Sequence, residues 1–408
     1  LTWGLLGLSW YSLKVMLLLF FGISVVLVYL LLRLGMNRAF SAGGAMLFAL
    51  SPIVLSLMMQ IRDFSKTPLM LGVLLLLTSL AMRPANRRRY FTYAAATGAL
   101  VGVGLGFRQD FTVCIPPALV ILAFCPRVEA AVPVRQRLVA IGLMLGFLAI
   151  AGFPILVARA RMSTLSHHYA IMGLATSHEA KMGMARASYQ LMPCPRDHFS
   201  HATRSSYAVR VLDELPPEPE SHRAAAAGRR FLLAYAATFP ADLVTRAYAA
   251  SLRILQGIAG RVEYAPTLLL VRLSRVFEPV SAHFTRFGPV YAVAALLMLA
   301  WRDLRLGLLG GFLLLYFTAY TSMQFQFRHC FHLAFVPFAL LLFVVHQSGA
   351  AVWRLRRSQA RAEAKRRLRA GGLRVAVFLL VTGLTLGGLL WGCWAGSCCS
   401  TSRHTPAC

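Results

Sequence analysis

Three short polar stretches interrupt long apolar runs in this chain, and each combines an arginine with another group that could take part in chemistry. They are residues 62–66, 107–110 and 326–329. In the first, the carboxylate of Asp63 stands beside the cations Arg62 and Lys66. A carboxylate can take a proton from a hydroxyl, and neighbouring cations can hold a phosphate. The first stretch therefore carries residue types suited to proton transfer beside an anion.

The other two stretches repeat parts of this pattern. Arg108 and Asp110 follow the glycines of residues 102–106, which allow close contact between helices. Arg328 and His329 are interleaved with aromatic residues, and they could bind a phosphate and a sugar or phosphate oxygen. Each stretch also has a structural interpretation, as a helix-terminal ion pair or as an interfacial aromatic belt with a snorkelling arginine.

Histidines and cysteines supply the remaining candidates. His167 and His168 directly follow an apolar run, and we expect them to line a site near the membrane surface. The spacing of the other histidines fits no metal signature, so the sequence predicts no metal and no cofactor. The C-terminal tail after position 390 holds four of the eight cysteines, and it is either unstructured or closed by a disulfide.

The elements that position these residues are predicted to be membrane-spanning helices. The chain has 408 residues, of which 58% are hydrophobic and only 14% are charged, and its mean hydropathy is +0.64. A soluble domain of this length would need more charge to cover its surface. The net charge of +28 does not indicate nucleic acid, because the basic residues lie in short loops beside apolar runs.

We therefore expect an all-α, polytopic membrane protein of about ten spans. The expected spans are 11–33, 39–60, 67–83, 90–106, 111–126, 137–158, 285–301, 304–321, 329–346 and 373–394. Arginine-rich loops, such as residues 84–89 and 347–372, should be cytoplasmic. All three polar stretches then fall on the opposite face, with the C-terminus.

One long extracytoplasmic loop, residues 159–284, divides the chain. From about Arg229, and again over residues 268–275, its sequence is alternately apolar and basic, which predicts amphipathic helices lying in the interface. The predicted parts are an N-terminal helical region (1–158), this loop (159–284) and a C-terminal helical region with the cysteine tail (285–408). Because the chain begins with Leu1, we expect N-terminal sequence to be missing.

The arrangement resembles the GT-C membrane glycosyltransferases, which include protein mannosyltransferases and lipid A aminoarabinose transferases. Three stretches carry the resemblance. They are Ala49-Leu50-Ser51-Pro52 leading to Arg62-Asp63, Gly98-Ala99-Leu100-Val101-Gly102 continuing to Arg108, and Arg328-His329 followed by Phe335-Val336-Pro337. One departure is clear, because the family's catalytic acid lies in its first outer loop and no acid precedes Asp63 here.

The resemblance implies transfer of a sugar from a polyprenyl-phosphate donor to a lipid, glycan or protein acceptor, on the extracytoplasmic face. Asp63 or Asp110 would take the acceptor's proton, and four cations would hold the phosphate: Arg62, Lys66, Arg108 and Arg328. The Arg- and Ala-rich composition suggests the inner membrane of a bacterium. Two other readings stay open, namely a transporter or flippase of a lipid-linked or anionic substrate, and a non-catalytic membrane assembly subunit.

Overall fold

The fold is seen in a computed structural model that describes residues 7, 9–124, 132–161, 166–185, 197–218, 221–263, 267–355 and 370–388. Every regular element in these ranges is a helix. Eight helices within them are long and apolar enough to cross a membrane. The predicted class, an all-helical membrane protein with many spans, is confirmed; the expected number of ten spans is not, since the described residues contain eight such helices.

Two of the expected spans are shorter than predicted, and proline accounts for the first of them. The expected span 39–60 is broken into α3 (Arg38–Ala49) and α4 (Pro52–Leu57), because the residue before a proline disfavours helical geometry. Ser51 is extended there, with ψ of 123°. The expected span 111–126 consists of the 3₁₀ helix η1 (Gln109–Cys114) and the short helix α8 (Ile115–Phe124).

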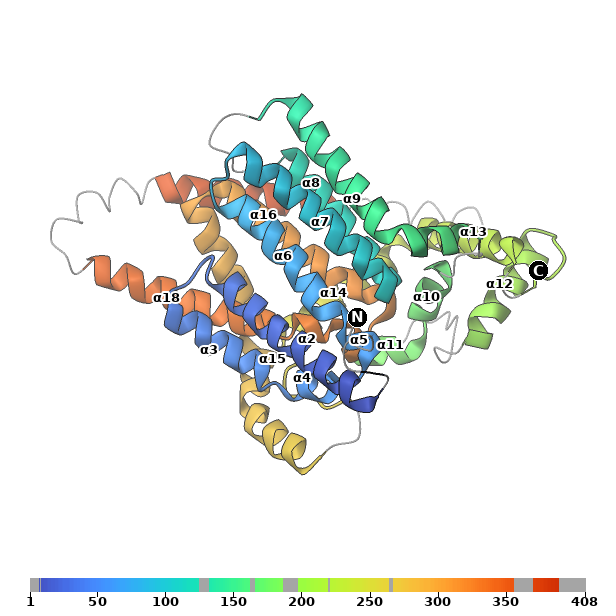
Figure 1. The fold of residues 1–408 in the computed structure, drawn as a ribbon, viewed down its shortest axis with the longest axis horizontal. Coiled ribbons are helices and arrows are strands. Elements are labelled where there is room, and N and C mark those ends of the chain that lie inside the picture. The colour runs from blue at the N-terminus through green and yellow to red at the C-terminus, as the bar shows by residue number, and fades with distance from the viewer. Residues whose placement is uncertain are drawn as a thin grey trace.

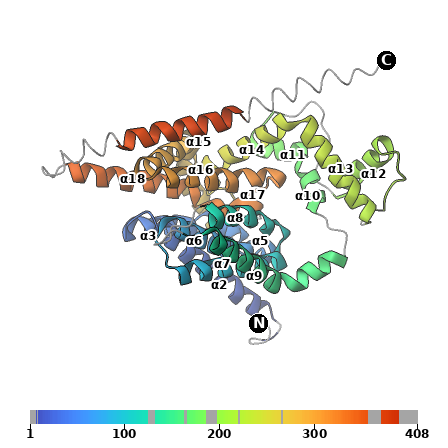
Figure 2. The same cartoon turned by 90° about the horizontal axis from the view of Figure 1, so that it is seen from above.

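The spans form two layers, which Figure 2 shows from above and Figure 1 face-on. The first layer holds the N-terminal helices. They are α2 (Trp10–Leu32), α3, α5 (Ile61–Phe64), α6 (Lys66–Met82), α7 (Arg87–Phe107) and α9 (Val134–Arg161). The second layer holds α15 (Leu268–Arg302), α16 (Leu304–Ala319) and α18 (Val336–Leu355), with the span Ala370–Gly388 outside them.

Glycines hold α7 against α9. A Cβ added to Gly98 would lie 2.0 Å from the carbonyl oxygen of Met144, and one added to Gly102 would lie 2.6 Å from that of Leu148. Only hydrogen fits at these two positions, so the backbones of the two helices approach closely. This packing fixes the C-terminal end of α7, where the second polar stretch begins.

The helices of the long loop extend from the centre of the molecule to one end of the layers (Figure 1). They are α10 (Ser166–Gly173), α11 (Thr176–Met182), α12 (Asp197–Val211), α13 (His222–Thr238) and α14 (Pro240–Leu255). A buried guanidinium joins three of them, because Arg246 of α14 pairs with Glu179 of α11, pairs with Asp242 at 2.5 Å and donates to the Gly173 carbonyl of α10 at 3.3 Å.

The two predicted amphipathic segments have different outcomes. The first, from about Arg229, corresponds to α13 and α14, and Ser251 of α14 accepts a hydrogen bond from Thr318 of α16 at 2.8 Å. The second, residues 268–275, is the start of α15, a single helix of 35 residues that also contains the span expected at 285–301. The cysteine-rich tail and the first residues of the chain lie outside the described residues.

Candidate functional site

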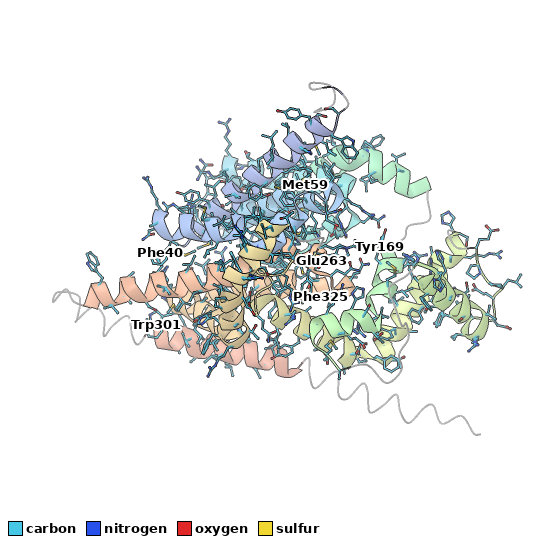
Figure 3. The ribbon with its side chains drawn as sticks, turned by 90° about the horizontal axis from the view of Figure 1, so that it is seen from below. Phe40, Met59, Tyr169, Glu263, Trp301 and Phe325 are labelled. Carbon is cyan, nitrogen blue, oxygen red and sulfur yellow. The ribbon has the colours of Figure 1, made fainter. Side chains whose placement is uncertain are left out.

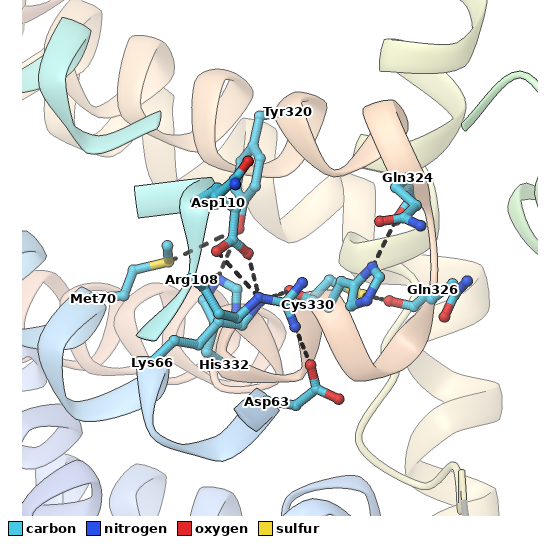
Figure 4. A network of polar contacts seen from close by, with 12 residues as sticks. Asp63, Lys66, Met70, Arg108, Asp110, Tyr320, Gln324, Gln326, Cys330 and His332 are labelled. Carbon is cyan, nitrogen blue, oxygen red and sulfur yellow. Dashed lines mark hydrogen bonds and ion pairs between the residues drawn. The ribbon is translucent and has the colours of Figure 1, made fainter. Parts of the chain in front are cut away.

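The first two polar stretches meet in one chain of charges. Lys66 donates to one oxygen of Asp110 at 3.1 Å, and Nε of Arg108 donates to the other oxygen at 3.2 Å. A second nitrogen of Arg108 donates to Asp63 (Figure 4). Residues from separate helices, 44 to 45 positions apart, therefore form one network of two cations and two carboxylates.

Breaks between helices bring these side chains together. Helix α7 ends at Arg108, whose backbone is extended (φ −151°, ψ 143°), and η1 begins at the next residue. Asp63 belongs to the one-turn helix α5, and Lys66 is the first residue of α6. The helix interruptions thus place Arg108 between Asp63 and Asp110.

Lys66 is fully buried and ties three elements together. Its ammonium also donates to the backbone carbonyl of His329 at 2.6 Å, which joins α6 and η1 to α17 (Phe327–Cys330). Burying a cation is costly unless acceptors surround it. Among the described residues the ammonium donates to Asp110 and to the His329 carbonyl, and the side chain is fully buried, so Lys66 acts within the scaffold and is not presented to a ligand.

The third stretch and the residues that follow it contribute a backbone turn and two histidines. Nδ1 of His329 lies 3.2 Å from the carbonyl of Gln324, and Nε of Arg328 donates to the side chain of Gln326 at 2.6 Å. His332 is completely buried, with Nε2 at 3.2 Å from the hydroxyl of Tyr320. Tyr320 belongs to the 3₁₀ helix η2 (Tyr320–Gln324).

A cavity of about 740 Å³ opens beside this network. Its apolar wall consists of Leu105, Phe107, Val113, Ile155, Ala158, Ala170 and Met323, with Tyr169, Tyr316 and Tyr320. Its polar groups are Arg62, Arg108, Gln109, Asp110, Thr112, Thr321, Gln324 and His329. The walls come from α7, α9, α10, α16 and η2, so the cavity lies where both layers and the long loop meet.

Four of the nine residues singled out from the sequence line this cavity: Arg62, Arg108, Asp110 and His329. Asp63 and Lys66 belong to the adjoining network but do not line the cavity. Arg328 is half-buried, and the cavity lining does not include it.

His167 and His168 are buried elsewhere, against α12 and α13. Nδ1 of His168 lies 3.4 Å from a guanidinium nitrogen of Arg204, and a Cβ on Gly228 would lie 2.3 Å from the ring of His167. Burial, with the nearby charge of Arg204, lowers the pKa of His167 to about 4. The two histidines do not line the cavity; the residues that follow them, Tyr169 and Ala170, do.

The sequence analysis did not single out Tyr320, Thr321 and Gln324, which line the cavity from η2. A usable signal was present, since residues 320–324 turn from apolar to polar at the predicted outer end of a span. Their position beside Arg108 in one cavity depends on the tertiary arrangement of η2 and the end of α7, which no local pattern encodes.

No three or more His, Cys, Asp or Glu side chains of the described residues are placed to hold a metal ion together. Comparison of the chain with protein-family models, with curated proteins and with solved structures found no match. An apolar space whose lining includes two arginines and a carboxylate suits an amphipathic anion, whose charged group would meet Arg62 and Arg108.

Proposed function

We infer that this protein is a membrane glycosyltransferase of the GT-C type, which moves a sugar from a polyprenyl-phosphate donor to an acceptor on the extracytoplasmic face. One observation carries the proposal: Arg62, Arg108 and His329 converge on a largely apolar cavity. A polyprenyl phosphate combines an apolar chain with an anionic head, and the cavity offers a complementary surface to each. The proposed setting is the inner membrane of a bacterium.

The two arginines have different tasks in this mechanism. Arg62 is exposed and makes no ion pair with any residue that the structure describes, so its charge is available to a ligand. Arg108 is held in place by Asp63 and Asp110. A fixed guanidinium stabilises charge that develops on the departing phosphate without reorganising during the reaction.

Asp110 lines the cavity and Asp63 pairs with Arg108 of that lining; of the two carboxylates, Asp63 is the less engaged and therefore the better proton acceptor. Both oxygens of Asp110 are engaged, one with Lys66 and one with Arg108. Within the part of the chain that the structure describes, the carboxylate of Asp63 accepts a hydrogen bond through one oxygen only. In the proposed step the acceptor oxygen bonds to the anomeric carbon and its proton passes to Asp63. The bond from that carbon to the phosphate oxygen breaks, and the phosphate keeps the electron pair.

Thermal unfolding in detergent tests this assignment. Undecaprenyl phosphate should raise the unfolding midpoint of the wild-type protein, because a ligand that binds only the folded state stabilises it. Arg62→Ala should abolish the shift, whereas Arg210→Ala, which removes an exposed arginine from α12, should keep it. An equal shift in wild type and Arg62→Ala would remove the arginine from the donor site.

Cysteine labelling tests the orientation. In a background without native cysteines, Met59→Cys should react with an impermeant thiol reagent in intact cells, and Asn86→Cys should not. Both positions are exposed, so a difference in labelling reports the side of the membrane and not burial within the protein. The opposite labelling pattern would place the cavity on the cytoplasmic face.

A transporter or flippase is the second candidate, and a specific observation favours it. The Lys66–Asp110 pair lies among helices that are interrupted at residues 50–51 and 108, and buried charges beside broken helices are typical of transport pathways. Reconstituted vesicles separate the two functions. Movement of a lipid-linked sugar across the bilayer with no transfer to an acceptor would support transport and contradict the glycosyltransferase.

A further inference from the structure

The cavity lining offers a ligand no unengaged carboxylate among the residues that the structure describes. Its one described carboxylate is that of Asp110, and both oxygens of this group are bonded, one to Lys66 at 3.1 Å and the other to Arg108 at 3.2 Å. Apart from the two arginines, the remaining polar groups of the lining are amides, hydroxyls and an imidazole. A ligand therefore meets arginines and uncharged hydrogen-bonding groups there.

Two amide side chains in this lining have no protein partner among the described residues. Gln109 and Gln324 are both half-buried, and only their backbone carbonyls take part in the contacts that the structure describes. A carboxamide has two N–H donors and an oxygen that accepts. Sugar hydroxyls also donate and accept, so the two amides are complementary to them.

Both amides are tied to the polar network. Gln109 directly precedes Asp110 at the start of η1, and Gln324 is the last residue of η2. The backbone carbonyl of Gln324 lies 3.2 Å from Nδ1 of His329, and the carbonyl of His329 accepts a hydrogen bond from Lys66 at 2.6 Å (Figure 4). Since Lys66 also bonds Asp110, a continuous series of contacts joins the two segments that carry the amides.

Two hydroxyls and an aromatic side chain complete a surface suited to a sugar. The hydroxyl of Thr112 donates to the Gln109 carbonyl at 3.0 Å, and that of Thr321 donates to the Thr318 carbonyl at 2.7 Å, so both oxygens can accept from a ligand. Tyr169 lines the same cavity, and Figure 3 shows it where the layers meet the helices of the long loop. Its ring can pack against a sugar ring whose hydroxyls bind the polar groups.

The charges of the site match a donor with a single negative charge. Lys66 and Arg108 balance Asp63 and Asp110 within the network, and Arg62 adds one positive charge to the lining. A phosphodiester carries one negative charge. An amine on the sugar would add a cation where the described lining has no unengaged carboxylate. A carboxylate on the sugar would compete with the phosphate for Arg62.

We propose that Gln109 and Gln324 bind hydroxyl groups of the donor sugar, and that this sugar is uncharged. The assignment rests on the proposed glycosyltransferase function and adds the chemical class of the transferred sugar to it. The phosphate remains with Arg62 and Arg108, while the two amides select the group that is attached to it.

Binding of three farnesyl phosphodiesters in detergent tests this selection. The compounds carry glucose, glucosamine or glucuronic acid, so their sugar rings differ in charge. We expect the wild-type protein to bind the glucose compound about tenfold more tightly than the other two. Gln109→Ala and Gln324→Ala should each bind it about threefold to tenfold more weakly, because hydrogen bonds to its hydroxyls are lost. Both variants should bind farnesyl phosphate, which has no sugar, like the wild type.

A charge substitution and a matched control make the test specific. Gln324→Glu should bind the glucosamine compound about tenfold more tightly than the wild type does, since it places a carboxylate in the lining. Gln256→Glu adds the same charge outside the lining and should keep the wild-type preference. Equal binding of the three compounds by the wild type, wild-type affinity for the glucose compound in both alanine variants, or the same gain for glucosamine in both glutamate variants would overturn the proposal.

The undecaprenyl phosphate shift separates this inference from the proposed function. A shift with undecaprenyl phosphate, together with equal affinities for the three sugar compounds, would leave the glycosyltransferase standing and remove the sugar assignment. No shift and no binding of any farnesyl compound would contradict the donor itself, and both proposals would then be wrong.

Discussion

Arg246 is the side chain whose loss should damage the long loop most directly. It is 2% exposed, pairs with Glu179, which is 1% exposed, and bonds Asp242 at 2.5 Å. Burial alone would lower the pKa of its guanidinium, but the hydrogen bond and charge of Asp242, with the charge of Glu179, raise it overall. Arg246→Met fills a similar volume and removes the positive charge with which both carboxylates pair.

The expected cost follows from that burial. Removing one partner from a buried ion pair destabilises a protein by about 3–5 kcal/mol, because the remaining charge loses its compensation away from water. The same substitution at Arg230, whose pair with Glu214 is 59% and 42% exposed on the two side chains, should cost under about 1 kcal/mol. The two variants thus compare one chemical change in two environments.

Equilibrium unfolding by SDS in mixed micelles measures both costs. The double variant Arg246→Met/Glu179→Gln should recover part of the lost free energy, since it also removes one of the two buried carboxylate charges. A cost for Arg246→Met no larger than that for Arg230→Met would refute the reasoning. The donor site should respond too, because Arg246 holds the Gly173 carbonyl of α10, and Tyr169 and Ala170 of α10 line the cavity. The affinity for undecaprenyl phosphate should fall.

Three further predictions rest on local geometry. Gly98→Ala should destabilise the protein by several kcal/mol, since a Cβ there lies 2.0 Å from the Met144 carbonyl, whereas Gly142→Ala, with open space around it, should be neutral or slightly stabilising in the same SDS titration. Lys66→Met should cost about 3 kcal/mol in that titration and leave the affinity for undecaprenyl phosphate intact once folded; lost affinity without lost stability would contradict its scaffold role. Burial lowers the pKa of His178 to about 4, so the unfolded chain binds the extra proton between about pH 6.5 and pH 4 and stability falls as pH drops through that window. His178→Gln should remove about 2 kcal/mol of the difference between pH 7.5 and pH 5, and an unchanged pH profile would contradict the buried neutral form.

Some of the site could be predicted because its residues are scarce where they stand. The sequence alone shows a carboxylate between Arg62 and Lys66 at the end of an apolar run, and it shows Arg108 two residues before Asp110. Their common location follows from the alternation of arginine-rich and mixed loops, because basic loops stay on the cytoplasmic side and helices must alternate. The sequence thus predicted the membrane class and the segments that carry the polar network.

Roles within that network depended on distances across helices. Nothing local distinguishes Lys66, which is fully buried against Asp110 and the His329 carbonyl, from Arg62, which is exposed to the cavity. The difference arises because the chain turns between α5 and α6 and directs neighbouring side chains to opposite environments.

The sequence by itself determined a helical membrane protein and the polar stretches between its apolar runs. The length of an apolar run and the charges beside it are local properties, and they determine whether a segment crosses a bilayer. The tertiary structure alone decided that both oxygens of Asp110 are engaged by cations and that His167 and His168 pack against α12 and α13. The polar network also depends on contacts between segments far apart in the sequence, such as the bond from Lys66 to the His329 carbonyl, with a separation of 263 residues. Packing sets such contacts, and no periodicity along the chain encodes them.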